Sequence, residues 1–563
     1  MHFSRLQNSV YRAAQILMAV AVVLMAGWNA YICLRLRPDV PTVVINLSFW
    51  LLPILMLLAA SGRLWRSLAL GTAVTFCLQR LHWLKWRYLE QTWTAADLRL
   101  ALDSANWLVV WQYPEILAFV VAGASLLVLS WLLVPRESRV RWQTRVLAVL
   151  MAVALAGTVV QWRHRHVFDP FGFNTYGHFA NLVYSASTLT YQPPAIDGSS
   201  ALFLARAATL PDGHDPTVVS ATATPATPDI VIWLQESAMD LRLFDLPGAD
   251  LPALPMYDPD ASTRAHGPLR VHSWGGSTWL TEFALLTGLS HEDFGASGNG
   301  VYYTVTSNLQ YSLPTLLKSR GYRAVAISGV PKALYNMEAA QRDLGFDEVL
   351  NPLDFPEWGG KSVVQNLVTD AELGRFAQQT LARSRDRPIL LFVLSMMQHG
   401  PYDSTHPVRY GLDQAELPRP LAARTSDYVD RMVATSIASA AFGAELLGGS
   451  RPVVYAYFGD HQPNLGGPVP YVSGVAHPQY LTAYAVKTNF PTPVAVGHAR
   501  ALDISYLAAV ILEQAGLPLG PLFDANRRMR LLCDGQLTEC PDQALTRSYR
   551  AHLYRDLLAA RLH

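Results

Sequence analysis

The first third of the chain contains several apolar segments long enough to cross a lipid bilayer, and this restricts the region to helices. The four clearest segments are residues 13–34, 43–60, 116–134 and 146–162. A spanning helix needs about 20 residues to cross a hydrocarbon core roughly 30 Å thick, and it satisfies its own backbone hydrogen bonds there. A fifth segment, 68–84, is shorter and is interrupted by polar residues. The sequence therefore predicts a multi-pass transmembrane domain of about five helices over residues 1–162.

Basic residues between the predicted spans indicate their orientation. Arginines gather at positions 136–145, between the last two spans, and Arg63 and Arg66 lie between the second and third. Loops rich in arginine and lysine stay in the cytoplasm. Arg35 and Arg37 are exceptions, because this arrangement places them on the outer side. With five spans, everything that follows Trp162 is expected outside the cytoplasm.

The segment 82–113 is rich in tryptophan, leucine and basic residues, and it has two equally good interpretations. It forms either an amphipathic aromatic helix at the lipid headgroups or a packed helical hairpin without contact to lipid. A stretch rich in proline, threonine and alanine follows further on, at residues 210–228, and such a composition does not bury enough surface to fold alone. Residues 163–228 are therefore predicted to be a juxtamembrane segment and linker.

Cysteine usage agrees with an oxidising compartment. Cys33 and Cys77 fall within predicted spans, where a thiol acts as a small apolar side chain. Cys533 and Cys540 lie close together near the carboxyl end and are expected to close a short loop as a disulfide. The formal net charge of +1 gives no sign of a nucleic-acid partner.

Residues 229–563 show the pattern of a single α/β domain. Short apolar runs rich in β-branched residues alternate with helical, polar stretches; the clearest runs are residues 229–234, 322–327, 389–394 and 452–458. Alternating strands and helices of this kind favour a central, mostly parallel sheet covered by helices.

Three of these runs end at residues that can hold a metal ion or a phosphate. Glu236 follows the first run, His399 lies just beyond the third, and Asp460 and His461 follow the fourth. The carboxyl ends of parallel strands meet at one crevice, so these residues are expected to converge. A neighbouring carboxylate and imidazole offer a divalent cation one oxygen and one nitrogen ligand. Each residue taken alone is equally typical of an ordinary turn or loop.

Thr278 follows two glycines and a serine in the loop between the first two of these sites. Its hydroxyl becomes a nucleophile only when a metal ion or a base removes its proton, and the residues above would supply that ion. The alternative is a helix N-cap, with Glu282 close to capping-box spacing. Both are compatible, because a helix amino terminus favours anions. The pattern predicts metal-assisted phosphoryl transfer, in which His399 binds the phosphate or protonates the leaving oxygen.

Four motifs, in this order along the chain, resemble the lipoteichoic acid synthase and phosphoglycerol transferase family of the alkaline phosphatase superfamily. They are Gln235-Glu236-Ser237, Gly275-Gly276-Ser277-Thr278 with Glu282-Phe283, His399-Gly400-Pro401-Tyr402 and Phe458-Gly459-Asp460-His461. The resemblance covers most of the chain, including several spans before an outward-facing catalytic domain. It implies one divalent metal ion held by Glu236, Thr278, Asp460 and His461.

The resemblance also implies a two-step reaction. Thr278 attacks the phosphodiester of a phospholipid head group, diacylglycerol leaves, and a phosphothreonine intermediate forms. A hydroxyl of a glycan or a lipid-linked sugar then takes the phospho-alcohol. Phosphoglycerol is the expected head group. The resemblance places the catalytic domain outside a bacterial cytoplasmic membrane. Paired cysteines and the lack of a wall-binding module favour a Gram-negative periplasm, with a glucan or another exopolysaccharide as acceptor.

One position departs from the family. Tyr335 fills the place of the aromatic residue that grips glycerol phosphate, but Met337 stands where the family has an arginine. Loss of a bidentate anion fork is a large chemical change in a phosphate site. Lys332 and Arg342 are candidates to replace it. A phosphoethanolamine donor, as in the sister family of transferases, is therefore the alternative.

Other readings of the sequence remain. A type I sulfatase needs a cysteine or serine in a C-x-P-x-R setting, which none of the four cysteines has. A periplasmic phosphodiesterase would use the same residues with water as acceptor. A membrane scaffold or transporter predicts functional polar residues within the spans, where Asn29, Asn46 and the Gln79-Arg80 pair are the candidates and none is convincing. Manganese, zinc and magnesium all suit the ligand set, and His272 and His477 are expected to be surface or loop histidines rather than a second metal site.

Overall fold

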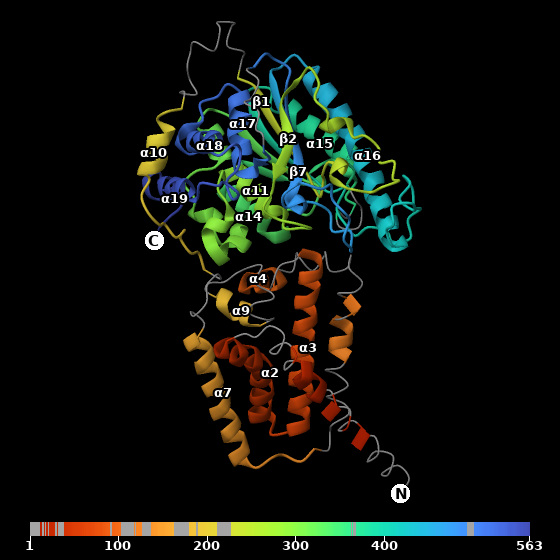
Figure 1. Ribbon diagram of the computed structural model, residues 1–563, viewed down its shortest axis with the longest axis vertical. Helices are drawn as coiled ribbons and strands as arrows, with labels where there is room; N and C mark the ends of the chain where they lie inside the picture. Colours follow the sequence, from red (N-terminus) through yellow and green to blue (C-terminus); the bar gives the residue numbers. More distant parts are fainter. Residues whose placement is uncertain are drawn as a thin grey trace. The chain divides into compact units, whose positions relative to one another are not determined.

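The computed structural model describes residues 39–89, 93–102, 137–162, 179–186, 190–210, 227–361, 363, 368–492 and 500–562, with isolated positions between 12 and 31 and between 117 and 125. The chain divides into two compact units, Met1–Thr190 and Tyr191–His563 (Figure 1).

The first unit is helical. Helices α2 (Val40–Ser61) and α7 (Trp142–Trp162) are long and apolar enough to cross a membrane, and both pack together. They match two predicted spans. The predicted span 68–84 lies within α3 (Leu64–Leu89), which also packs on α2. Most of the spans predicted at 13–34 and 116–134 lies outside the described residues. The described part thus contains two candidate membrane helices, and the five-span domain stays a prediction.

The two arginine-bearing loops of this unit lie together at one end. Glu137 accepts hydrogen bonds from the backbone N–H groups of Trp65 (2.6 Å) and Arg66 (3.1 Å), at the amino terminus of α3. Arg145 donates to the Ala59 carbonyl (2.8 Å) near the carboxyl end of α2. Both side chains carry the charge that complements the helix dipole they meet. This arrangement agrees with the prediction that both loops share one side of the membrane.

Near the other end of α3, that helix contacts α4 (Ala95–Leu102). Lys85 pairs with Asp97 at 2.7 Å, and the Ala95 N–H donates to Ser185 Oγ at 2.8 Å. These contacts favour the packed hairpin over the lipid-bound helix for residues 82–102, while residues 103–113 lie outside the described part. Asn46, in α2, accepts from the N–H of Ala180 (2.9 Å), where α9 (Ala180–Tyr184) begins. This polar residue therefore has a structural role.

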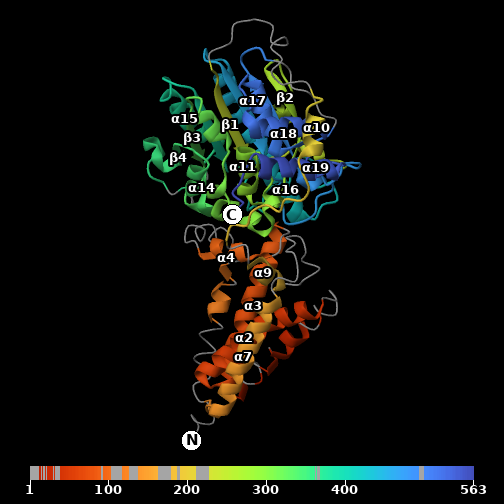
Figure 2. The same ribbon diagram turned by 90° about the vertical axis from the view of Figure 1, so that its left-hand side faces the viewer.

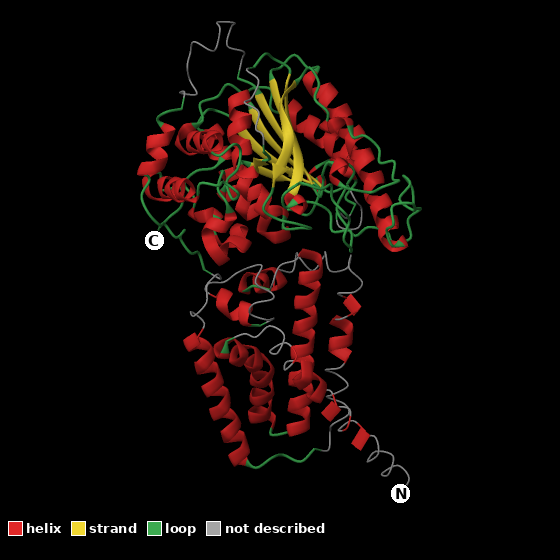
Figure 3. Ribbon diagram, viewed as in Figure 1, coloured by secondary structure: helices red, strands yellow, loops and turns green. Residues whose placement is uncertain are grey.

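The second unit is built on an eight-stranded mixed sheet with the strand order β4-β3-β5-β1-β6-β7-β2-β8 (Figure 3). The strands are β1 (Asp229–Gln235), β2 (Thr263–Arg270), β3 (Arg323–Ser328), β4 (Glu348–Leu350), β5 (Ile389–Ser395), β6 (Val453–Gly459), β7 (Leu481–Thr488) and β8 (Leu502–Asp503). Strands β4, β3, β5, β1 and β6 are parallel, whereas β7 runs antiparallel to both β6 and β2. The predicted α/β domain is confirmed, with a mixed sheet; its four predicted strands are β1, β3, β5 and β6.

Helices cover both faces of the sheet (Figure 2). They are α10 (Ala201–Ala207), α11 (Thr278–Thr287), α12 (Val301–Thr304), α13 (Leu313–Lys318), α14 (Met337–Asp343), α15 (Asp370–Ala382), α16 (Arg419–Leu447), α17 (Leu507–Gln514), α18 (Gly520–Leu532) and α19 (Gln543–Ala551). Successive residues of β1 point to opposite faces. Ile230 and Ile232 pack in the core that includes α11 and α17, and Val231 and Trp233 pack in the core that includes α15 and α16. A strand buried on both faces explains the continuous apolar run.

Helix α10 belongs to the second unit, although it precedes the domain start predicted at residue 229. Phe203 is buried with its ring 5.2 Å from that of Tyr549, and its N–H donates to Ser548 Oγ at 2.9 Å. Residues 211–226, most of the predicted linker, lie outside the described part. The second unit therefore includes a helix from the segment predicted to be juxtamembrane.

Cys533 and Cys540 form a disulfide, as the sequence predicts. Loss of a bridge that closes so short a loop is expected to cost about 2 kcal/mol, chiefly because the unfolded chain gains freedom. The double variant Cys533→Ser, Cys540→Ser should therefore unfold at lower denaturant concentration, followed by fluorescence in detergent solution. Cys77→Ser leaves the bridge in place and should not shift this transition. An unshifted transition in the double variant would contradict the stabilising role.

Candidate metal and nucleophile site

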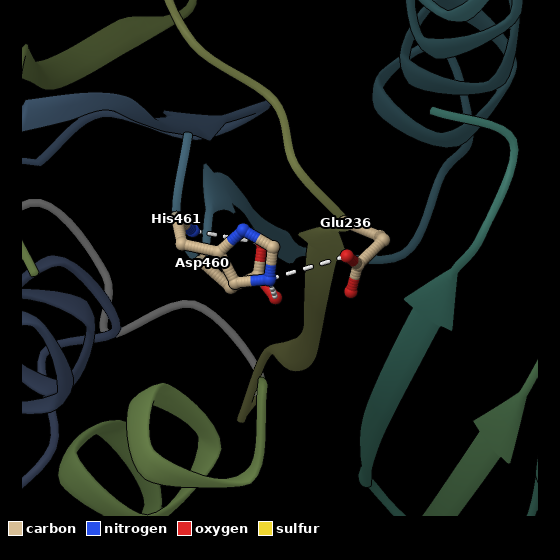
Figure 4. A group of neighbouring side chains, drawn as sticks. All are labelled: Glu236, Asp460 and His461. Atoms are coloured by element: carbon tan, nitrogen blue, oxygen red, sulfur yellow. Dashed lines mark hydrogen bonds and ion pairs between the residues drawn. The ribbon is translucent and has the colours of Figure 1, made fainter. Parts of the chain in front are cut away.

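Two neighbouring parallel strands bring the predicted metal ligands together. Glu236 follows β1, and Asp460 and His461 follow β6, while Gln235 pairs in register with Gly459. The ends of the two strands therefore meet at one point, as expected for a parallel sheet. Figure 4 shows the Glu236 carboxylate turned toward the His461 ring, with Asp460 beside it.

The ligand atoms of these three residues form a tight, buried cluster. His461 Nε2 lies 3.2 Å from Glu236 Oε1 and 3.3 Å from Asp460 Oδ2. All three side chains are buried, and the three ligand atoms lie within 4.8 Å of one another. The Ser237 N–H donates to Asp460 Oδ1 at 2.8 Å and orients that carboxylate. This is the spacing at which one cation could contact all three residues.

Thr278 reaches the same cluster from α11, of which it is the first residue. Its hydroxyl donates to Glu236 Oε2 at 2.7 Å. Gly275, Gly276 and Ser277 all have positive φ angles, so the chain turns sharply just before the helix. Ser277 occupies the N-cap position without a side-chain capping bond. The N-cap interpretation of Thr278 is therefore wrong, because its hydroxyl is directed at a carboxylate and not at the helix backbone.

The electrostatics of the cluster suit a bound cation. Burial and the neighbouring Glu236 raise the pKa of Asp460 well above its usual range. Burial acts most strongly on Glu236 and would raise its pKa as well. The charge and hydrogen bond of His461, together with His399 and Thr278, outweigh burial, so this pKa is lowered overall. Burial would lower the pKa of His461, yet Asp460 and Glu236 raise it to about 9. Two buried carboxyl groups thus face one imidazole ring.

Two ligand atoms of the cluster have unused hydrogen-bonding capacity. Asp460 Oδ2 and His461 Nε2 are buried, and within the described residues Nε2 meets Oδ2 and Glu236 in ion-pair contacts that lack hydrogen-bond geometry. Buried polar atoms normally find a partner, and oxygen and imidazole ligands together suit divalent manganese, zinc or magnesium. The residues therefore fit a divalent cation held by Glu236, Asp460 and His461, with Thr278 beside them.

His399 lies in the turn after β5, on the far side of β1 from β6. Its charge is among the influences that lower the pKa of Glu236, so it lies within electrostatic range of the cluster. Arg431 donates to the His399 carbonyl at 2.6 Å and fixes the turn from α16. The structure thus brings His399 to the same edge of the sheet, and its role in catalysis stays a prediction.

Tyr335 also lies beside the site, on the short helix η6 (Leu334–Asn336). Its hydroxyl donates to Glu282 Oε1 at 3.3 Å, and its ring lies 5.3 Å from that of Trp279. Met337, at the position of the expected arginine, is fully buried in the hydrophobic core. Glu282, which the sequence presented only as a capping residue, instead lies behind these rings; no spacing rule signals that position.

The two cations proposed to replace the missing arginine form ion pairs outside the cluster. Lys332 pairs with Asp354 at 3.3 Å, and Arg342 pairs with Glu338 at 3.1 Å on the surface of α14. The prediction that Lys332 or Arg342 replaces the missing arginine is not tested, and these ion pairs do not favour it.

His272 lies in a loop, as one of the two expectations had it, but it is buried and not on the surface. It is buried just beyond β2, and its Nε2 lies 3.1 Å from each carboxylate oxygen of Asp503. The segment after β2 is buried, and the pairing of β2 with β8 places Asp503, which is distant in sequence, beside it. The pair anchors the loop that leads to Thr278. His477 is exposed, as expected.

Known proteins resemble both the sequence and this fold. Residues 228–493 match the sulfatase family. The chain is 30% identical over 523 residues to an uncharacterized protein of Haemophilus influenzae, covering 90% of this chain and 93% of that protein. The chain belongs to the same family as that protein and carries a sulfatase-family domain.

Two further proteins resemble part of this chain. The capsular polysaccharide biosynthesis protein RkpI of Rhizobium meliloti is 29% identical over 249 residues, which make up 42% of each chain. The structure of the Streptococcus pyogenes phosphoglycerol transferase GacH, in complex with sn-glycerol-1-phosphate, superimposes with a TM-score of 0.50 at 18% identity. It covers 65% of this chain and 95% of that one. At this identity the likeness shows a common fold.

The ligand cluster predicts a defined effect on metal content. Asp460→Asn removes one anionic ligand, so affinity for manganese or zinc should fall by at least about 100-fold, measured as metal bound after equilibrium dialysis. Asp229→Asn is the matched control, because Asp229 is a buried carboxylate at the opposite end of β1, paired with Arg451. Equal loss of metal in both variants would contradict the assignment.

The buried His272–Asp503 pair predicts a pH-dependent stability. Burial opposes the charge on His272, but Asp503 raises its pKa from 6.5 to about 9. The stabilisation is therefore complete below about pH 6.5 and is lost as the pH rises to 9. Across this range the wild-type free energy of unfolding should fall by about 2–3 kcal/mol more than that of His272→Gln, measured by denaturant titration at several pH values. Parallel pH profiles would refute the charged pair.

Proposed function

We propose that the second unit is a phosphotransferase that moves a phospho-alcohol head group from a membrane phospholipid to a sugar hydroxyl through a phosphothreonine at Thr278. One observation carries the proposal. The Thr278 hydroxyl stands at the amino terminus of α11 and donates at 2.7 Å to a carboxylate of the buried ligand cluster. This combines a nucleophile, a proton acceptor and an anion-binding helix end in one place.

In the proposed reaction, the residues of this chain orient the nucleophile and hold the cation. Glu236 takes the hydrogen bond of the Thr278 hydroxyl and orients the oxygen for attack. Glu236, Asp460 and His461 would hold one divalent cation, which would supply positive charge to favour ionised Thr278 and the phosphoryl oxygens. The first backbone N–H groups of α11 face the same anionic oxygens.

The proposed chemistry is balanced over two steps. In the first, the Thr278 hydroxyl loses its proton, the bond from Thr278 Oγ1 to phosphorus forms, the bond from phosphorus to the diacylglycerol oxygen breaks, and that oxygen receives a proton. In the second, a sugar hydroxyl loses its proton and bonds to phosphorus, the bond from phosphorus to Thr278 Oγ1 breaks, and Oγ1 regains a proton. His399, at the same sheet edge, is proposed to bind the phosphate or to donate the proton to the leaving oxygen.

Two head groups and several acceptors are candidates. The name of GacH supports phosphoglycerol, as the sequence resemblance implies. The burial of Met337 in place of an arginine supports the alternative, phosphoethanolamine. The name of RkpI supports a polysaccharide acceptor. We place the reaction on the periplasmic side of a bacterial inner membrane, where α2 and α7 would anchor the enzyme.

Intact mass of the purified protein tests the covalent step. After incubation with manganese or zinc and phospholipid vesicles, the wild type should gain one head-group phosphate, and Thr278→Ala should gain none. Turnover should fall by on the order of 10³-fold or more in that variant, because the nucleophile is lost. Thr281→Ala is the control on the same helix, since the Thr281 hydroxyl donates to the Asp460 backbone carbonyl and not to the carboxylate cluster.

Two results would contradict this mechanism. Release of diacylglycerol by Thr278→Ala at the wild-type rate would show that another group attacks phosphorus. Release of free head-group phosphate at the same rate with and without glycan would show that water is the acceptor, as in a phosphodiesterase.

A further inference from the structure

Glu282 is a buried carboxylate beside the proposed nucleophile that the reaction above does not use. It lies one helical turn after Thr278 on α11, and side chains at this spacing share a helix face. Side chains also lean toward the amino terminus of their helix, which directs Glu282 toward Thr278. Its side chain is fully buried. A carboxylate of this kind is rare unless a cation or several donors meet it.

Only neutral donors meet Glu282 within the described part of the chain. Tyr302 donates to Oε2 at 2.6 Å, and Gln341 donates to the same oxygen at 3.1 Å. The other oxygen, Oε1, receives only the longer bond from Tyr335, at 3.3 Å. A carboxylate offers about four acceptor positions, so Oε1 retains capacity for a stronger donor. Burial raises the pKa of Glu282 to about 7.

Aromatic rings separate this carboxylate from the surface. The rings of Trp279 and Tyr335 lie 5.3 Å apart and are both partly exposed, whereas Tyr302 behind them is fully buried, 6.1 Å from Tyr335. Asn336 donates to the Tyr302 carbonyl at 2.7 Å and holds the two segments together. The faces of such rings attract cations. A buried carboxylate behind a pair of rings thus makes a chemical environment for an ammonium ion.

We propose that Glu282, Trp279 and Tyr335 form an ammonium subsite, so that the alcohol transferred through Thr278 is a primary amino alcohol. This inference rests on the proposed function. A two-carbon amino alcohol bonded to phosphorus at Thr278 has a reach comparable to the four residues, about 6 Å along the helix axis, that separate Thr278 from Glu282. Its ammonium would give Oε1 a charge-assisted donor, which a glycerol hydroxyl does not.

The same subsite gives a reason for methionine at position 337, where the family has an arginine. Met337 lies on α14 one turn before Gln341, which donates to Glu282. An arginine at this position would bring a positive charge to the helix whose Gln341 contacts Glu282, whereas the buried methionine brings none. The loss of the arginine and the presence of the acidic subsite therefore favour the same head group.

A competition experiment on the full-length protein tests the subsite. The protein is incubated with manganese or zinc and vesicles containing equal amounts of phosphatidylethanolamine and phosphatidylglycerol, and intact mass reports which head-group phosphate is attached. The wild type should carry mainly phosphoethanolamine. In Glu282→Gln the ratio of phosphoethanolamine to phosphoglycerol adduct should fall by about 10-fold or more, because a hydrogen bond to a charged group is lost. Glu338→Gln, an acid on α14 that pairs with Arg342, is the matched control and should keep the wild-type ratio.

A second measurement needs no variant. With metal present, phosphoethanolamine should raise the thermal unfolding midpoint of the wild type more than sn-glycerol-1-phosphate does at equal concentration. Three results would overturn the subsite but leave the proposed phosphotransferase activity intact. They are a wild type that accepts only phosphoglycerol, an unchanged adduct ratio in folded Glu282→Gln, and a larger increase in the unfolding midpoint with glycerol phosphate. Glu282 would then be a structural link between α11, α12 and α14. Absence of any adduct from either lipid would instead overturn the proposed function together with the subsite.

Discussion

The in-register pairing of β1 with β6 is the constraint on which the site depends. It places Glu236 against Asp460 and His461 at the end of a strand pair that is buried on both faces. Buried like charges repel strongly, and their burial is tolerated only when an opposite charge is held between them. The imidazole of His461 supplies part of that charge, and the remaining unsatisfied atoms fit a divalent cation. The fold therefore holds two carboxyl groups close together in the interior, at the point where the proposed phosphoryl transfer needs a bound cation.

The surrounding elements hold this arrangement from several directions. The turn at Gly275–Ser277 aims the first residue of α11 at Glu236, and the buried His272–Asp503 pair anchors the same loop from the antiparallel side of the sheet. Arg431 of α16 fixes the turn that carries His399. Helix α11 thus serves two purposes in the proposal, because its amino terminus presents the nucleophile and its next turn presents the carboxylate that would select the head group.

Sequence reasoning recovered the central strands and the residues of the proposed ligand cluster for related reasons. Continuous apolar runs indicate buried parallel strands, and a polar residue directly after such a run lies at the end of its strand. The runs of β1, β5 and β6 therefore pointed to the residues that follow them, which are Glu236, His399, Asp460 and His461. Local pattern misjudged residues whose role depends on distant partners. Glu282 has capping-box spacing yet contacts Tyr302, Gln341 and Tyr335, and His272 looks like a loop residue yet lies buried against Asp503.

The sequence by itself determined the apolar segments, the α/β class and the identity of the residues around the proposed nucleophile, because these follow from hydrophobic periodicity and from chemistry that few residue types provide. Only the tertiary structure decided which partners each polar side chain meets: the mixed sheet with its antiparallel β7, the recruitment of α10 before residue 229, and the aromatic surroundings of Glu282. Contacts between residues far apart in the chain arise from packing, and packing leaves no local signature in the order of amino acids.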